Sequence, residues 1–196
     1  KMAGMPVGPL SLQDEVALDL GLKITKATEA DLGPNAIDQA QKKLIVEMVE
    51  KQGRFGRKNG KGFYDYPEKG KGQKSLWPGL AALQPKQLDP DTLSVEELKQ
   101  RFLVVQAVEA ARTVEDHVIT DPREADVGSI LGFGFAPFTG GTLSYIDFMG
   151  PKKFVELCHK LEAKYGSRFT PPKLLEEMAA KGETFYGRFA PKKAAA

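Results

Sequence analysis

The chain has 196 residues, of which 41% are hydrophobic, so it is large enough for one globular domain or two small ones. Its 28 basic and 26 acidic residues give a formal net charge of +2, and this near balance gives no indication of a polyanion partner from the bulk charge alone. No apolar run approaches the roughly 20 residues that span a bilayer, so we expect no transmembrane segment and no signal peptide. Cys158 is the single cysteine, which excludes an internal disulfide and fits a reducing compartment.

The first expected element follows a glycine- and proline-rich approach. Residues 8–14 have the pattern Gly-x-Leu-Ser-x-x-Asp, in which Ser11 is expected to cap a helix that has Asp14 near its start. This helix is expected to end before Gly21, and residues 22–35 are expected to form a connector. A second helix should begin near Pro34 and end at Gly53, with an apolar face made by Ile37, Ala40, Leu44, Ile45, Met48 and Val49.

Residues 54–66 are rich in glycine and aromatic side chains, which predicts a turn-rich extension. Three interpretations of its basic residues stay open: a solvated loop, which we favour, single-stranded nucleic-acid binding, and attraction of a phosphate-bearing cofactor tail. Residues 67–93 are expected to be a linker, apart from an apolar segment at 76–80 that should pack on a domain. The basic residues are Arg54, Arg57, Lys58, Lys61, Lys69, Lys71 and Lys74.

A longer helical region follows. Ser94 and Glu97 form a capping box, and an apolar residue at every third or fourth position predicts a helix to about Val118. Further helices are expected over residues 124–132, between Pro151 and Gly166, and between Pro172 and Gly182. No segment shows a sustained alternation of apolar and polar residues, so the predicted class is all-α.

Two parts of the chain share a pattern. Residues 141–147 repeat the Gly-x-Leu-Ser-x-x-Asp of residues 8–14, and Phe185-Tyr186 resembles Phe63-Tyr64. An internal repeat indicates the organisation of a chain more strongly than any single predicted helix or strand. We therefore predict two duplicated helical modules. The expected domains are a first module at 1–66 that lacks its N-terminal helix, a linker at 67–93, a second module at 94–187 and a flexible tail at 188–196.

No set of residues forms a complete catalytic group or a metal site. His117 and His159 lack the spacing of metal ligands, and Cys158 and His159 are helix neighbours whose side chains diverge by about 100°. Glu109, Arg112 and Glu115 have a spacing of three, which predicts a salt-bridged helix surface. The glycine-rich loops follow no predicted strand, which argues against a dinucleotide or nucleoside triphosphate site.

The duplicated pattern nevertheless resembles a known family. Residues 4–10 with Asp14 resemble the start of the C-terminal helical domain of 3-hydroxyacyl-CoA dehydrogenases, and residues 56–66, Gly-Arg-Lys-Asn-Gly-Lys-Gly-Phe-Tyr-Asp-Tyr, resemble its closing motif. Residues 106–112, 125–135 and 140–147 resemble the second copy of this domain in multifunctional fatty-acid oxidation enzymes. The resemblance spans residues 3–187 and implies a fold like the C-terminal domain of 6-phosphogluconate dehydrogenase, with the modules packed as an intrachain pseudo-dimer.

The resemblance implies NAD-dependent oxidation of (S)-3-hydroxyacyl-CoA to 3-ketoacyl-CoA in β-oxidation. The family's catalytic His, Glu and Ser lie in a Rossmann domain, which would also bind NAD, and its Asn lies on the helix that the first module lacks. We therefore assign no catalytic residue here, and neither Asn35 nor Asn59, nor Gln106 or Glu109 of the second module, replaces that Asn. The candidates for one wall of the acyl-CoA cleft are Met5, Pro6, Gly8 and Pro9.

The isolated chain is expected to be inactive and to work with the N-terminal Rossmann domain of a longer enzyme. Such an enzyme is expected to carry an enoyl-CoA hydratase as well and to have a thiolase subunit as a candidate partner. A cytoplasmic location of the bacterial type is expected, with mitochondrial and peroxisomal locations as alternatives. The rival interpretation is a purely structural helical module that assembles the enzyme and contacts no ligand.

Overall fold

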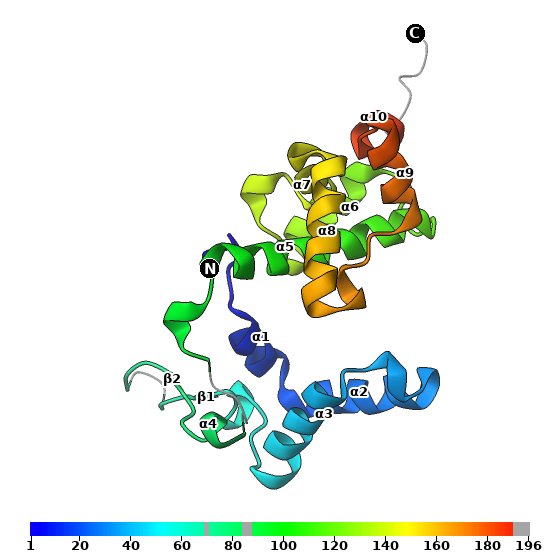
Figure 1. Cartoon of the computed structure of the whole chain (residues 1–196). Coiled ribbons are helices and arrows are strands. Elements are labelled where there is room, and N and C mark those ends of the chain that lie inside the picture. The colour runs from blue at the N-terminus through cyan, green and yellow to red at the C-terminus, as the bar shows by residue number, and fades with distance from the viewer. Residues whose placement is uncertain (69–70, 84–87, 190–196) are drawn as a thin grey trace. The chain divides into compact units, whose positions relative to one another are not determined.

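The computed structural model describes residues 1–68, 71–83 and 88–189, and helices dominate it (Figure 1). The predicted all-α class is confirmed, and the described residues contain no helix long and apolar enough to cross a membrane. Contacts divide the chain into unit 1, made of Lys1–Pro6 and Pro90–Ala196, and unit 2, made of Val7–Asp89. Each unit is described by itself, and the domain boundaries expected from the sequence stay predictions.

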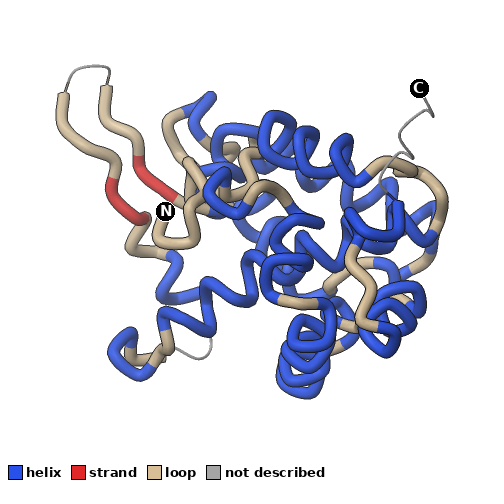
Figure 2. The backbone as a smooth tube through the Cα atoms, turned by 90° about the horizontal axis from the view of Figure 1, so that it is seen from above, coloured by secondary structure: helices blue, strands red, loops and turns tan. Residues whose placement is uncertain are grey.

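Unit 2 is a group of short helices closed by a hairpin. Its core contains Leu18, Met48 and Phe63, and Trp77 and Leu80 pack against it, which confirms the expected packing of residues 76–80. Strands β1 and β2 pair antiparallel through Tyr64 and Leu76, and Figure 2 shows them side by side. The elements in chain order are α1 (Pro9–Val16), α2 (Leu18–Leu32), a 3₁₀ turn (Pro34–Ala36), α3 (Gln39–Val46), a π-helical turn (Glu47–Lys51), a 3₁₀ turn (Arg57–Asn59), β1 (Tyr64–Asp65), β2 (Ser75–Leu76) and α4 (Leu80–Leu83).

The start of unit 2 differs from the sequence prediction. Ser11 is not the N-cap of α1, because the helix already begins at Pro9 after the extended Gly8. The break comes at Ala17, whose φ of 86° lies in the left-handed region, and Gly21 lies inside α2. Residues 22–32, expected to be a connector, are helical because Leu18 and Leu22 stand one turn apart and both enter the core.

The second predicted helix of unit 2 starts later than expected. Pro34 lies in a 3₁₀ turn, and α3 is capped by Asp38, whose carboxylate accepts the amides of Ala40 and Gln41 at 3.0 and 3.1 Å. The expected apolar face is present, since Ile45 and Met48 are buried. The helix ends as a π-helical turn before Gly53.

Unit 1 is built around α7, which lies against α5, α6, α8 and α10. Leu143 and Ile146 of α7 are fully buried, as are Phe154 of α8 and Phe185 of α10. Figure 1 shows α8 and α9 side by side, joined by a short connection. The elements are a 3₁₀ turn (Pro90–Thr92), α5 (Val95–Glu115), α6 (Pro122–Phe133), a 3₁₀ turn (Pro137–Thr139), α7 (Thr142–Met149), α8 (Pro151–Tyr165), a 3₁₀ turn (Ser167–Phe169), α9 (Lys173–Lys181) and α10 (Phe185–Phe189).

Most helix ends of unit 1 were predicted correctly. The Ser94 hydroxyl accepts the Glu97 amide at 3.2 Å, but the Glu97 carboxylate bonds to Lys164 and Tyr165 instead of completing the capping box. Glycines end α8 and α9 as expected, at Gly166 and Gly182. The predicted tail begins inside α10, and residues 190–196 lie outside the described residues.

In each unit one aspartate joins the Gly-x-Leu-Ser-x-x-Asp motif to a Phe-Tyr pair far along the chain. Asp14 accepts the Phe63 amide at 2.8 Å and the Tyr64 amide at 3.0 Å. Asp147 accepts the amides of Phe185 and Tyr186 at the same two distances. The interpretation of the motif as an ordinary helix cap is therefore wrong, because both aspartates bond to other segments.

The Asp14→Asn variant tests this link in unit 2. Asp14 is fully buried and also accepts the Tyr66 hydroxyl at 3.0 Å, so an amide group would lose charge-assisted bonds and present N–H to a donor. We expect the free energy of unfolding of unit 2 to fall by about 2–3 kcal/mol. Urea unfolding followed by the fluorescence of Trp77, the only tryptophan, measures it. The exposed Asp31→Asn is the matched control, and equal midpoints for the two variants would contradict the prediction.

A glycine exchange tests the corresponding region of unit 1. Gly141 has a φ of 124°, and a Cβ on it would overlap Asp126, so Gly141→Ala should lower the free energy of unfolding by about 3 kcal/mol. Gly132→Ala, inside α6 with open space around the added methyl, should be neutral or stabilising by up to about 1 kcal/mol. Thermal unfolding monitored by circular dichroism compares them, and a Gly141→Ala variant as stable as Gly132→Ala would refute the overlap.

Candidate functional site

A buried arginine organises the closing loop of unit 2. The Arg54 guanidinium donates to the Gly62 carbonyl at 2.7 Å and to the Asp65 carboxylate at 2.5 Å. It also stacks over the Trp77 ring, 4.2 Å from its centroid. Arg54 is only 5% exposed, so this cation holds the loop against β2 and is not available to a ligand.

The basic residues around this loop are mostly paired. Four of the six that are described form ion pairs with carboxylates, and Lys69 lies outside the described residues. This pairing favours the interpretation as a salt-bridged, solvated loop over binding of a nucleic-acid backbone. The pairs are Arg54–Asp65, Arg57–Glu15, Lys58–Asp19 and Lys71–Glu68.

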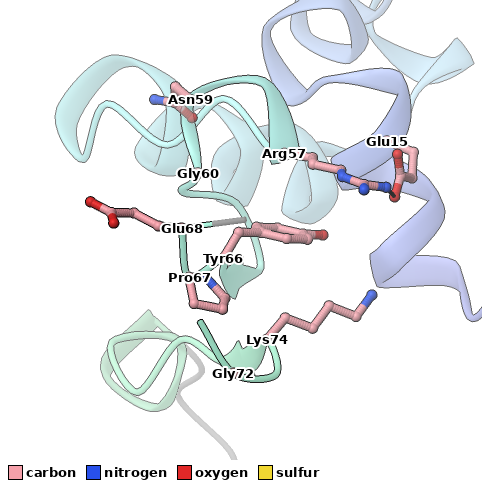
Figure 3. Close-up of a pocket in the computed structure, with 9 residues that line it drawn as sticks. All are labelled: Glu15, Arg57, Asn59, Gly60, Tyr66, Pro67, Glu68, Gly72 and Lys74. Carbon is pink, nitrogen blue, oxygen red and sulfur yellow. Dashed lines mark hydrogen bonds and ion pairs between the residues drawn. The ribbon is translucent and has the colours of Figure 1, made fainter. Parts of the chain in front are cut away.

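An open polar recess lies beside the closing loop (Figure 3). Its volume is about 840 Å³, and the Tyr66 ring forms one wall between the Arg57–Glu15 pair and Lys74. Burial, followed by the hydrogen bond to Asp14, raises the pKa of Tyr66, so its hydroxyl stays a donor at neutral pH. The lining residues are Glu15, Arg57, Asn59, Gly60, Tyr66, Pro67, Glu68, Gly72 and Lys74.

Lys74 reaches from this recess to the first turn of α1. Its ammonium donates to the Ser11 hydroxyl at 2.6 Å and lies 4.6 Å from the centroid of the Tyr64 ring. In Figure 3 the Lys74 side chain is extended toward α1. A cation next to the positive end of a helix makes this part of unit 2 electropositive.

The four candidate residues for the cleft wall are divided between the two units. Met5 and Pro6 belong to unit 1, where the Met5 sulfur accepts the side-chain amide of Gln106 at 3.4 Å. Gly8 and Pro9 belong to unit 2 and form the start of α1. Pro6 and Pro9 are exposed, and Met5 and Gly8 are half-buried. The assignment of these residues to a cleft stays a prediction.

A buried carboxylate in unit 1, that of Asp126, was missed at the sequence level. Asp126 of α6 is 2% exposed and accepts the amides of Leu143 and Ser144 at 2.7 and 3.1 Å. It also accepts the Ser144 hydroxyl at 2.5 Å and the Tyr186 hydroxyl at 2.8 Å. The sequence signal that could have indicated a buried carboxylate was the position of this aspartate within the short apolar run of residues 124–132.

Asp126 and Asp147 therefore both serve the packing of unit 1. Burial raises the pKa of Asp147, the bonds from the Tyr186 and Phe185 amides lower it, and the nearby Asp126 charge raises it again. Because each carboxylate is occupied by donors from the fold, neither is placed to transfer a proton to a ligand. Their arrangement stabilises structure and does not form an acid–base pair.

An apolar recess of about 450 Å³ lies between α5 and α6. Gln106 and Glu109 stand on its α5 side, where the Gln106 side chain donates to the Phe102 carbonyl at 2.6 Å. The Thr142 hydroxyl lies in this region, buried and without a hydrogen-bond partner in the described part of the chain.

The histidines and the cysteine lie apart from these features. His159 faces Glu162 at 3.3 Å and Glu176 at 3.5 Å on the surface of unit 1, and His117 follows α5 in a left-handed conformation. Cys158 is fully buried, and burial raises the pKa of its thiol to about 12, so it is unreactive. Within the described ranges no three His, Cys, Asp or Glu side chains form a metal-ligand group.

The predicted salt-bridged face of α5 is present in part. Arg112 pairs with Glu109, and it also donates to the Thr170 carbonyl at 2.8 Å. Glu115 does not join the pair but accepts the Leu174 amide in the first turn of α9 at 2.8 Å. These side chains attach α9, and the residues that lead into it, to α5.

The described residues do not fit a dinucleotide. A pyrophosphate cradle needs a strand that leads through glycines into a helix, but β1 and β2 have two residues each, and the glycine-rich residues 134–141 follow a helix, α6. No step of a hydride transfer is therefore assigned to side chains of this chain.

Comparisons with known proteins show which proteins the chain is similar to. Residues 1–66 match the model of the 3-hydroxyacyl-CoA dehydrogenase C-terminal domain. The chain is 40% identical over 184 residues to the fatty acid oxidation complex subunit alpha of Shewanella amazonensis, a match that covers 93% of this chain and 25% of that protein. The crystal structure of 3-hydroxybutyryl-CoA dehydrogenase from Escherichia coli K12 matches with a TM-score of 0.61 at 19% identity, over 92% of this chain and 52% of that one.

The structural match supports the fold alone, because its sequence identity is low. The sequence matches go further, since they include both the opening motif with Asp14 and the closing motif with Phe63-Tyr64. The chain spans about a quarter of the length of the Shewanella relative. Residues 1–66 are therefore similar to the 3-hydroxyacyl-CoA dehydrogenase C-terminal domain, and most of the chain is similar to a part of a fatty acid oxidation complex alpha subunit.

Proposed function

We propose that this chain is the C-terminal helical part of an NAD-dependent (S)-3-hydroxyacyl-CoA dehydrogenase of fatty-acid β-oxidation. NAD and the catalytic groups belong, in this proposal, to a Rossmann domain of the longer enzyme. The role of this chain is to provide one wall of the acyl-CoA cleft and to stabilise the assembled enzyme. A hydratase domain and a thiolase subunit are its proposed companions. The Shewanella relative is named as the alpha subunit of a fatty acid oxidation complex, which supports a partner subunit without identifying it.

The observation that carries the proposal is the match of residues 1–66 to the dehydrogenase C-terminal domain. Asp14 supports it, because it joins the two ends of the matched segment through the Phe63 and Tyr64 amides. Pro6 and Pro9 are exposed and Gly8 is half-buried, so each of these residues is accessible to an extended acyl chain.

We also propose that units 1 and 2 are copies of one module. The equivalence of Asp14 with Asp147, and of Phe63-Tyr64 with Phe185-Tyr186, supports it, because the same donors reach the same acceptor at the same distances. A duplicated module buries a self-complementary apolar face within one chain, as two subunits of a dimer would do.

Enzyme assays test the proposed function. The 196-residue chain alone should give no NAD-dependent oxidation of 3-hydroxyacyl-CoA, measured by NADH absorbance. A chimera in which this chain replaces the matching segment of the Shewanella alpha subunit should retain kcat/KM within about tenfold, a barrier change below about 1.4 kcal/mol. Activity of the isolated chain, or a folded chimera without dehydrogenase activity, would overturn the proposal.

A substitution of Met5 in that chimera tests whether this residue lines the acyl-CoA cleft. If its side chain contacts the acyl chain, Met5→Ala should raise KM for a long-chain substrate by about tenfold with less effect on kcat, since it removes uniform apolar binding. Met2→Ala is the matched control, because Met2 is 74% exposed. Equal KM values for the two variants would show that Met5 does not line the cleft.

The rival is a purely structural or oligomerisation module with no ligand contact. One observation favours it: the buried polar groups Asp14, Arg54 and Asp126 are all used within the fold. Hydrogen exchange of the chimera with and without a CoA thioester separates the two. Protection at residues 5–9 supports the cleft wall, and protection confined to helix packing residues supports the rival.

A further inference from the structure

The apolar recess between α5 and α6 of unit 1 has the size and the lining of a small-molecule site. Its volume of about 450 Å³ lies within the range of about 300–1,000 Å³ that is usual for such sites, which are mostly apolar with a few polar groups. The described residues that line it all belong to unit 1. The apolar ones are Val105, Ala110, Ile119, Ala125, Gly128 and Phe133.

One hydroxyl group in this α5–α6 recess is left without a hydrogen bond. Among the described lining residues three carry a hydroxyl, and the fold uses two of them. Thr113 donates to the Ala110 carbonyl at 2.7 Å, and Ser129 donates to the Asp126 carbonyl at 2.8 Å. The hydroxyl of Thr142, the first residue of α7, is fully buried and has no partner in the described part of the chain. An unpaired buried hydroxyl is unfavourable, so an oxygen atom of a ligand would stabilise this position.

The open side of the recess is acidic. Glu124 is exposed and the Glu109 side chain is 63% exposed, whereas Thr142 is fully buried, so the two carboxylates mark the side that faces solvent. Arg112 pairs with Glu109 but does not line the recess, and none of the described lining residues is basic. An anion would meet carboxylates at the opening, and deeper inside it would lose its hydration without gaining a cation. The charge therefore favours an uncharged ligand.

We propose that the α5–α6 recess binds an uncharged amphiphile, a molecule with an apolar chain and one hydroxyl or carbonyl oxygen. The oxygen forms a hydrogen bond with the Thr142 hydroxyl, and the apolar chain packs against Val105 of α5 and against Ala125 and Gly128 of α6. The inference goes beyond the proposed function, because an uncharged molecule is not an acyl-CoA and its binding is measured without any dehydrogenase activity.

Titration of the chain with n-octanol, followed by NMR of methyl groups, tests the site. The Val105 and Ile119 methyls line the recess and should shift in a saturable way, while those of the buried Leu175 should not. Octanoate at neutral pH should bind at least about tenfold more weakly, because its carboxylate meets no cation there. Absence of a saturable shift at the two reporters, or equal affinities for octanol and octanoate, would overturn the proposal.

Two threonine variants test the hydrogen bond. Thr142→Val keeps the shape of the side chain and removes the unpaired hydroxyl, so it should weaken octanol binding by about fivefold. Thr113→Val is the matched control, because the Thr113 hydroxyl lines the same recess but already donates to the Ala110 carbonyl. Equal octanol affinities of the two variants would contradict the proposed role of Thr142.

Two glycine variants of α6 test the location and do not depend on Thr142. A Cβ on Gly128 or on Gly132 would meet nothing within 4 Å, so both positions accept a side chain. Gly128 lines the recess and Gly132, one turn further along, does not. Gly128→Leu should fill the recess and abolish octanol binding, and Gly132→Leu should leave the affinity unchanged within about twofold. Equal binding by the two variants would place the ligand elsewhere.

The other candidate occupant is a further part of the longer enzyme. The chimera with the Shewanella alpha subunit distinguishes the two, because a segment that covers the recess would exclude octanol from it. We expect the chimera to bind octanol with an affinity within about threefold of that of the chain, and Gly128→Leu to abolish this binding as well. A folded chimera that no longer binds octanol would overturn the recess as a ligand site.

Discussion

Each unit depends on one aspartate, fully buried in unit 2 and half-buried in unit 1, that accepts two consecutive backbone amides from a distant Phe-Tyr pair. Asp14 lies 49 residues before Phe63, and Asp147 lies 38 residues before Phe185. Burying a carboxylate is unfavourable unless donors satisfy it, so the pairing requires the two segments to meet in one register. Once they meet, the aromatic side chain of Phe63 or Phe185 enters the core of its unit.

This link also explains the glycines of the closing motif. A side chain at Gly56 would overlap the Asp14 backbone, and one at Gly62 would overlap its carboxylate. The Gly-Arg-Lys-Asn-Gly-Lys-Gly sequence therefore follows from how closely the loop must approach α1, with Arg54 closing it from the other side. Arg57, Lys58 and Asn59 of the motif all bond to other groups of unit 2, so they serve this packing.

The sequence was informative where local signals and packing agree. Pro151 and Gly166 bound α8, and Ser94 caps α5, because these residues act within one or two turns of their own helix. It was misleading at Ser11 and Gly21, since a serine followed by an acid resembles a cap and glycine resembles a helix end. At both residues the local structure is determined by contacts with segments that lie far away in the sequence. The bonds of Asp126 and Asp147 could not be predicted, because their partners are set by the fold alone.

The starts of α7 in unit 1 and of α1 in unit 2 lie in different electrostatic surroundings. In unit 1 the start of α7 meets the Asp126 carboxylate, so the helix dipole and the amides are neutralised within the unit. In unit 2 the start of α1 meets the Lys74 ammonium, which adds positive charge to the same kind of helix end. Glu15 and Glu68 line the same recess as Lys74, so carboxylates of unit 2 lie in the region of this cation.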